Sequence, residues 1–186
     1  MSRLLQKFSR KKLLQGRLKT RTDIKQMKYD LVIIGGGASG LMCAQTAGHR
    51  GLKVLVLDSS NKVGKKILMS GGGRCNFTNY FIEPSCYISK NPHFCKSALK
   101  RYTQWDFIEL MDRHAIAWHE KRLGQLFCDG SARQVVAMLV EELERAGAEL
   151  SLSTEIADIA RHESDFALTL TGPFGRRHAR CRNLVV

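Results

Sequence analysis

The stretch that decides the fold is Leu31-Val-Ile-Ile-Gly-Gly-Gly-Ala-Ser-Gly-Leu-Met-Cys-Ala44, followed by Gly51-Leu-Lys-Val-Leu-Val-Leu-Asp58. Residues 31–34 have the length and β-branched content of a strand that is buried on both faces. A second buried strand is predicted at 54–57, and a helix that begins near Ala38 connects the two. This strand–helix–strand order predicts an α/β fold with a parallel sheet.

The glycines between the first strand and the helix each meet a geometric need. Gly35 permits the tight turn, Gly37 lets a pyrophosphate approach the backbone, and Gly40 lets the helix pack on the sheet. The unpaired N–H groups and the positive dipole at the start of the helix favour an anion there. Eighteen residues after Gly40, the carboxylate of Asp58 can accept hydrogen bonds from ribose hydroxyls. These residues predict a dinucleotide site, and the alternative is a turn with a purely structural role.

Composition indicates a soluble globular protein. The chain has 186 residues, 44% of them hydrophobic and 25% charged, and no apolar run approaches the roughly 20 residues that cross a bilayer. Its six cysteines include no C-x-x-C pair and no zinc-like spacing, and there is no secretory signal, so we expect free thiols, a cytoplasmic location and no metal site. His114 and His119 are interpreted as ordinary surface or helix-end residues.

The formal net charge of +13 is concentrated near the N-terminus. Residues 1–26 hold nine Lys and Arg residues and one acid, so they contribute +8 and the remaining residues +5. We divide the chain into a basic extension at 1–29 and part of a nucleotide-binding domain at 30–186. The extension has the composition of a basic amphipathic helix on a membrane or on RNA, or of a transit peptide, and the alternative is a start codon placed too far upstream.

A second glycine cluster, Ser70-Gly-Gly-Gly-Arg-Cys-Asn-Phe-Thr-Asn79, exposes consecutive backbone N–H groups. Such a nest suits an anion or a polar ring edge, and the alternative is a flexible loop with an exposed arginine. Further along, apolar spacing predicts a helix over 97–113. A capping box of Ser131 with Gln134 predicts a second helix that ends near Gly147.

The last third of the chain is expected to complete the sheet. A third parallel strand is predicted at 149–152, and alternating apolar residues from Ile156 to Leu170 predict an antiparallel meander. Residues 183–186 resemble a fourth buried strand with no covering helix after it, which predicts a chain that ends inside its fold.

Residues 30–42 and 63–79 together closely resemble the bacterial YhiN/BaiN-type flavoproteins, a family of FAD-dependent, NAD(P)H-linked oxidoreductases often labelled aminoacetone oxidase-like. Residues 91–99, 103–107 and 123–129 resemble the YhiN branch, and the resemblance covers 28–186. Ser39 departs from the Gly or Ala of the family pattern, and Asp58 from its frequent Glu.

The resemblance implies FAD as cofactor and NAD(P)H as the electron donor of intact relatives. The FAD pyrophosphate would lie at the first glycine turn, the adenosine ribose at Asp58, and the ribityl chain and flavin along the second glycine cluster. Arg74 would stabilise reduced flavin or pair with a surface acid, Cys75 would be a small packing residue, and no residue can be named as catalytic. The implied cofactor-binding residues are Gly35, Gly36, Gly37, Ala38, Ser39, Gly40, Asp58, Lys65, Lys66, Ser70, Gly71, Gly72, Gly73, Arg74, Cys75, Asn76 and, through its backbone, Ile156.

Family members are roughly twice as long as this chain. The resemblance therefore implies a chain truncated before the final strand and the substrate domain, with impaired flavin chemistry. Two alternative functions remain at this point: an NAD-binding Rossmann protein without flavin, and a basic protein that binds RNA or a membrane surface through residues 1–28. We expect a small-molecule cofactor, no specific nucleic acid and no transmembrane segment.

Overall fold

The computed structural model describes residues 27–186 and contains a six-stranded sheet and a smaller three-stranded sheet. The expected extension lies outside the described residues up to position 26, and residues 27–29 belong to the first strand. No helix within 27–186 is long and apolar enough to cross a membrane.

The large sheet has the order β6-β2-β1-β9-β8-β7. Strands β1 (Met27–Ile34), β2 (Val54–Leu57), β6 (Glu149–Ser151) and β9 (Arg177–Val185) pair in parallel. Strands β7 (Glu155–Arg161) and β8 (Phe166–Thr171) continue the sheet as an antiparallel meander that returns through β9. The α/β class, the parallel sheet and the meander expected from the sequence are therefore confirmed.

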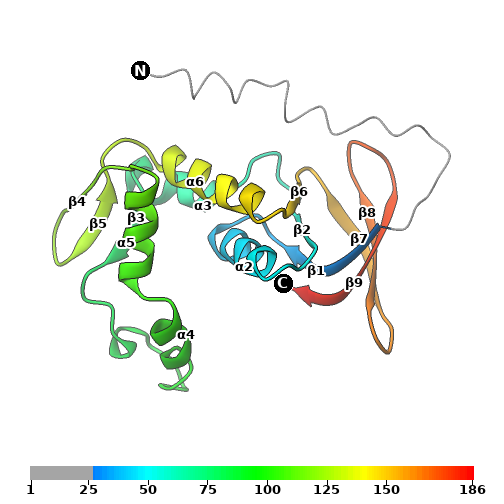
Figure 1. Ribbon diagram of the computed structural model, residues 1–186, viewed down its shortest axis with the longest axis horizontal. Helices are drawn as coiled ribbons and strands as arrows, with labels where there is room; N and C mark the ends of the chain where they lie inside the picture. The colour runs from blue at the N-terminus through cyan, green and yellow to red at the C-terminus, as the bar shows by residue number, and fades with distance from the viewer. Residues whose placement is uncertain (1–26) are drawn as a thin grey trace.

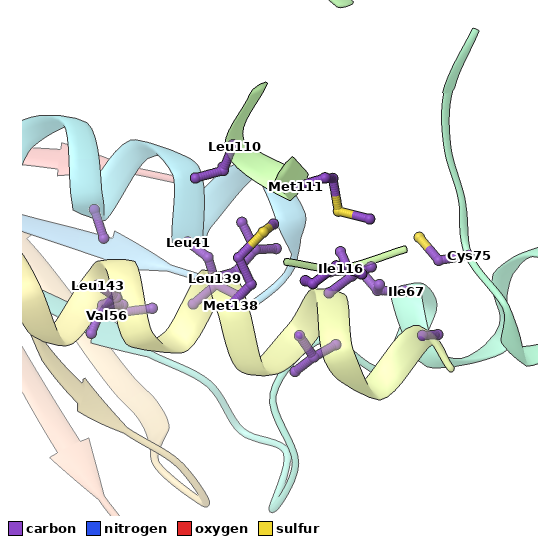
Figure 2. Packing of buried hydrophobic residues seen from close by; sticks show 14 of the residues in the cluster. Leu41, Val56, Ile67, Cys75, Leu110, Met111, Ile116, Met138, Leu139 and Leu143 are labelled. Atoms are coloured by element: carbon purple, nitrogen blue, oxygen red, sulfur yellow. The ribbon is translucent and has the colours of Figure 1, made fainter. Parts of the chain in front are cut away.

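Two helices cover one face of the parallel strands (Figure 1). Helices α2 (Ala38–His49) and α6 (Ala132–Arg145) pack closely, since a Cβ at Gly48 would lie 2.5 Å from the carbonyl oxygen of Ala146. Figure 2 shows Leu41 of α2 and Leu139 of α6 in the core beside Val56 of β2.

Alternate residues of β2 enter different cores, as a strand with two buried faces requires. Val54 and Val56 join the helix-covered cluster, whereas Leu55 and Leu57 join a second cluster with residues of β8 and β9.

The small sheet, with the order β3-β5-β4, and its helices form a separate lobe, which Figure 1 shows beyond one end of α6. The lobe is entered through α3 (Lys65–Met69) and the short 3₁₀ helix η1 (Ser70–Gly73). Its strands are β3 (Asn76–Asn79), β4 (Trp118–Glu120) and β5 (Gln125–Cys128), and its other helices are η2 (Pro84–Cys86), α4 (Lys96–Arg101) and α5 (Gln104–Arg113).

The single helix expected over 97–113 is wrong, because the chain breaks between α4 and α5. Thr103 is extended and caps α5: its N–H donates to the Asp106 carboxylate at 2.6 Å, and the Asp106 N–H donates back to the Thr103 hydroxyl at 3.4 Å. This reciprocal capping box starts a new helix where the apolar spacing alone continues.

The other capping signals are confirmed. Ser131 and Gln134 form a capping box at the start of α6, and Gly147 is left-handed, with φ +71°, just after its end.

The prediction of a buried strand at 183–186 is wrong about the burial of these residues. Residues 183–185 form the end of β9 beside β1, and Val185 and Val186 are exposed.

Candidate functional site

The first glycine turn has the geometry that its sequence predicts at two positions. Gly35 has φ +113°, a backbone conformation that residues with a side chain rarely adopt. A Cβ at Gly40 would lie 1.9 Å from the carbonyl oxygen of Gly35, so only glycine lets α2 approach the end of β1 so closely.

Gly37 differs, because no protein atom requires a glycine there. Its backbone is extended, with φ −84°, and a Cβ would meet nothing within 4 Å. Gly37 is also the N-cap of α2, where no side chain caps the helix and no acid lies in the first turn. Residues 37–39 are exposed and their N–H groups have no capping side chain, so an anionic group can approach the backbone at the start of α2.

Asp58 directly follows β2, and its carboxylate is hydrogen-bonded to the backbone of the glycine turn. Its carboxylate accepts hydrogen bonds from the N–H of Gly36 and of Ser60, both at 2.7 Å. Each carboxylate oxygen has a further lone pair, so the group can still accept hydrogen bonds from ribose hydroxyls.

The segment just before β7, the strand that carries Ile156, is hydrogen-bonded to Asp58. The Thr154 N–H donates to the Asp58 carbonyl at 2.9 Å, just before β7 begins. The side chain of Ile156 packs against the second hydrophobic cluster, so its backbone is what faces a ligand if the residue takes part.

The loop after Asp58 returns to the glycine turn. The Gly64 N–H donates to the Gly36 carbonyl at 2.9 Å, which places the start of α3 beside the turn. Gly64 has φ +66°, and a Cβ there would lie 2.8 Å from a Val136 methyl group. Lys65 and Lys66, in the first turn of α3, are both exposed, and a contact of either amine with a phosphate stays a prediction.

The second glycine cluster is left-handed at four positions, Gly71, Gly72, Gly73 and Cys75. A Cβ at Gly71 would lie 2.7 Å from the Phe127 ring, whereas Gly72 faces open space. The loop therefore rests on β5 through Gly71 and presents the backbone of Gly72 outward. Phe127 was missed by sequence reasoning because no local pattern connects it with residues so distant in the chain.

Two side chains of this loop have opposite environments. Arg74 is exposed, and no carboxylate within residues 27–186 forms an ion pair with it. Cys75 is buried in the helix-covered core (Figure 2), and burial raises the pKa of its thiol. The Cys75 side chain is thus a packing group, while a contact between its backbone and a cofactor stays a prediction.

The described structure brings the expected site residues together in two groups. The first group is the glycine turn at 35–40, to which hydrogen bonds join Asp58 and Gly64. Lys65 and Lys66 follow Gly64, and the start of β7 is joined to Asp58 through Thr154. Residues 70–76 continue from α3 and lead into the small sheet. The model of the HI0933-like protein Rossmann domain matches residues 29–186.

The chain belongs to the HI0933-like family. A ribosomal RNA dihydrouridine synthase of Escherichia coli is 57% identical over 145 residues, which are 78% of this chain and 36% of that protein. A protein of the same name from Haemophilus influenzae is 48% identical over 155 residues, 83% of this chain and 39% of that protein. This HI0933-like chain thus spans less than half of the length of both relatives, and the expected resemblance to YhiN-type proteins is confirmed.

Solved structures support the fold of this HI0933-like domain. The p-nitrophenol 4-monooxygenase PnpA of Pseudomonas putida superposes with a TM-score of 0.54 at 17% identity, covering 86% of this chain and 40% of that one. At this identity the superposition shows the fold alone, which is the Rossmann-type α/β fold that the family model also gives.

Proposed function

We propose that this chain binds FAD, with the pyrophosphate at residues 35–40 and the adenosine ribose at Asp58. The observation that carries the proposal is Gly37, whose missing side chain nothing in the protein requires and which lies at an uncapped helix N-terminus. A diphosphate explains both features, because it needs close backbone approach and unpaired N–H donors.

The second glycine cluster favours FAD over NAD alone. The turn and Asp58 suffice for either dinucleotide, but an NAD-binding protein has no need of the left-handed loop 70–75. This loop would lie along the ribityl chain and flavin, with Lys65 or Lys66 near the phosphates and Arg74 near the flavin.

The proposed reaction follows the relatives' name: reduction of uridine in ribosomal RNA, with NAD(P)H as donor. Uridine gains a hydride and a proton across its C5=C6 double bond and becomes dihydrouridine, while NAD(P)H is oxidised to NAD(P)⁺. Bound FAD supplies the two-electron transfer between nicotinamide and substrate, and the protein supplies binding and orientation.

FAD binding is tested by titrating the purified full chain with FAD and following flavin fluorescence, with ADP and NAD as competitors. Gly37→Ser adds a side chain where the pyrophosphate would lie, yet serine is a favourable N-cap, so thermal stability should be kept. We expect FAD affinity to fall at least about tenfold, the equivalent of 1.4 kcal/mol.

Ala98→Ser is the matched control, because this residue is exposed on α4, a helix of the small lobe that lies away from the first glycine turn. It should leave FAD affinity unchanged. Equal FAD affinity for Gly37→Ser and the unmodified chain, or binding of NAD without binding of FAD, would contradict the proposal. The reaction is tested separately, by mass spectrometry of dihydrouridine in ribosomal RNA from cells with and without the gene.

A further inference from the structure

Part of the small lobe exposes large apolar side chains. Phe81, Phe94 and Leu123 are 69%, 80% and 86% exposed, which leaves most of each side chain in water. Figure 1 shows α4 at the lower end of this lobe, below α5. The surface formed by residues 81–105 and 121–123 is called the arm surface, and its other exposed apolar residues are Tyr87, Ile88, Tyr102 and Trp105.

Hydrogen bonds hold the arm surface in a defined shape. The Cys86 thiol donates to the Phe81 carbonyl, the Cys95 thiol to the Pro84 carbonyl, and the Gln104 amide to the Tyr80 carbonyl. The Tyr80 ring also stacks on Trp105, with centroids 5.6 Å apart.

The β4–β5 turn is joined to the arm surface. The Tyr80 N–H donates to the Gly124 carbonyl at 2.9 Å, and the Phe81 ring lies so close to Gly124 that a Cβ would be 2.6 Å away. The β4–β5 turn, which carries Leu123, therefore packs against Phe81.

The arm surface is also strongly basic. Glu83 is the acid within these bounds, and its carboxylate accepts a hydrogen bond from the Ser85 hydroxyl. At the margins, the Asp106 carboxylate accepts from the Thr103 N–H, and the Glu120 carboxylate accepts from the Gly124 N–H. No ion pair within residues 27–186 neutralises its exposed bases, which are Lys90, Lys96, Lys100, Arg101, Lys121 and Arg122.

We propose that the arm surface binds single-stranded or loop RNA, with bases stacked on the exposed aromatic rings and phosphates beside the lysines and arginines. A surface that binds RNA with little sequence preference needs exposed aromatic rings interleaved with lysines and arginines that are free to contact phosphates. A protein partner fits less well, because lysine is depleted from protein–protein interfaces. This inference rests on the proposed function and departs from the expectation of no specific nucleic acid.

The position of the arm surface supports the same partner. The small sheet joins it to the proposed flavin loop, because Gly71 rests on the ring of Phe127 in β5, the strand that follows the β4–β5 turn. RNA held on the arm surface would thus lie on the lobe that also carries residues 70–76.

The test measures fluorescence anisotropy of a labelled, uridine-rich single-stranded RNA with the full chain. Charge reversal in α4, by Lys96→Glu, Lys100→Glu and Arg101→Glu together, should weaken binding at least about tenfold. It should also reduce the slope of log affinity against log salt by about two, since each lost phosphate contact accounts for about 0.7. The matched control reverses Arg161, Arg176 and Arg182, three exposed arginines of the meander, and should change affinity less than about twofold.

A second variant separates stacking from charge. Tyr87→Ala with Phe94→Ala should weaken RNA binding about fivefold or more while leaving the salt slope unchanged, because stacking involves no counterion release. Phe174→Ala, which removes a 72% exposed ring of the β8–β9 turn, should have no effect.

Equal losses in the α4 and meander variants would overturn the proposal, because residues 1–26 and total charge are the same in both. Unchanged RNA affinity in the α4 variant would also overturn it, as would loss of binding to phosphatidylserine vesicles without loss of RNA binding. FAD affinity, measured on the same variants, should be unchanged. If the unmodified chain binds RNA but not FAD, the cofactor proposal fails and the RNA surface stands.

Discussion

The Asp58 carboxylate accepts a 2.7 Å hydrogen bond from the backbone N–H of Gly36. The same carboxylate accepts from Ser60, so it connects the glycine turn after β1 with the loop after β2. Asp58 thus shapes the turn through the protein's own backbone, in addition to the ribose contact proposed for it. Loss of this carboxylate should therefore change both stability and cofactor affinity.

Asp58→Asn leaves one oxygen for two N–H donors and places an amide NH₂ against the second. We expect a loss of about 1–3 kcal/mol in the free energy of unfolding, because one partly buried N–H loses its acceptor. Urea unfolding measures this loss, and FAD titration should show about tenfold or weaker binding. Asp158→Asn makes the same chemical change at an exposed position of β7, and should be neutral in both measurements.

Gly40→Ala should destabilise the fold itself. The new Cβ would lie 1.9 Å from the Gly35 carbonyl oxygen, so α2 must move away from β1. We expect a loss of about 1–3 kcal/mol, typical of overpacking a close contact. Urea unfolding should show Gly37→Ala, whose Cβ meets nothing, to be clearly less destabilised; equal losses would show that α2 does not need this close approach.

The sequence predicted what depends on local geometry. The positions of Gly35 and Gly40, the capping box of α6 and the left-handed Gly147 all follow from contacts within a few residues. The break before α5 escaped prediction because the apolar spacing of α4 continues into α5 and conceals the Thr103 cap. The β4–β5 hairpin escaped because its strands are short and one of them contains the exposed His119 and Glu120.

Contacts between distant parts of the chain account for the remaining differences. The Phe127 ring under Gly71 supports the second glycine cluster, but neither residue predicts the other in the sequence. Strand β9 serves both as the last strand of the meander and as the parallel neighbour of β1, which is why residues 183–186 are not a separate strand.

The cysteines should differ strongly in reactivity. Burial raises the pKa of the Cys75 and Cys181 thiols, so at pH 7.5 each is both less accessible and less ionised than an ordinary cysteine. Cys86 is exposed. Mass spectrometry after brief treatment with iodoacetamide should find Cys86 modified first, with Cys75 and Cys181 modified only after unfolding in urea. Modification of Cys75 at the rate of Cys86 would show that the loop 70–76 opens readily.

Acid should weaken the contact between α5 and α6 through Glu142. The Nε2 atom of His114, at the end of α5, lies 2.8 Å from the Glu142 carboxylate, and Arg145 lies 2.9 Å from the same oxygen. Partial burial raises the pKa of Glu142, but His114 and Arg145 together outweigh it, so the net pKa is below the ordinary 4.5.

A lowered folded pKa means that the unfolded chain takes up the proton more readily. The stabilisation is therefore fully present above pH 4.5 and is lost as pH falls through the lower folded pKa. Glu142→Gln removes the charged carboxylate and with it this stabilisation. The variant should therefore be less stable than the unmodified chain by about 1–3 kcal/mol at pH 6, and this deficit should shrink as the pH falls to 3. Urea unfolding across this range measures the deficit. Glu144→Gln, exposed on the same helix, should show no such change, and a deficit for Glu142→Gln that is constant with pH would mean that Glu142 acts through packing rather than through its charge.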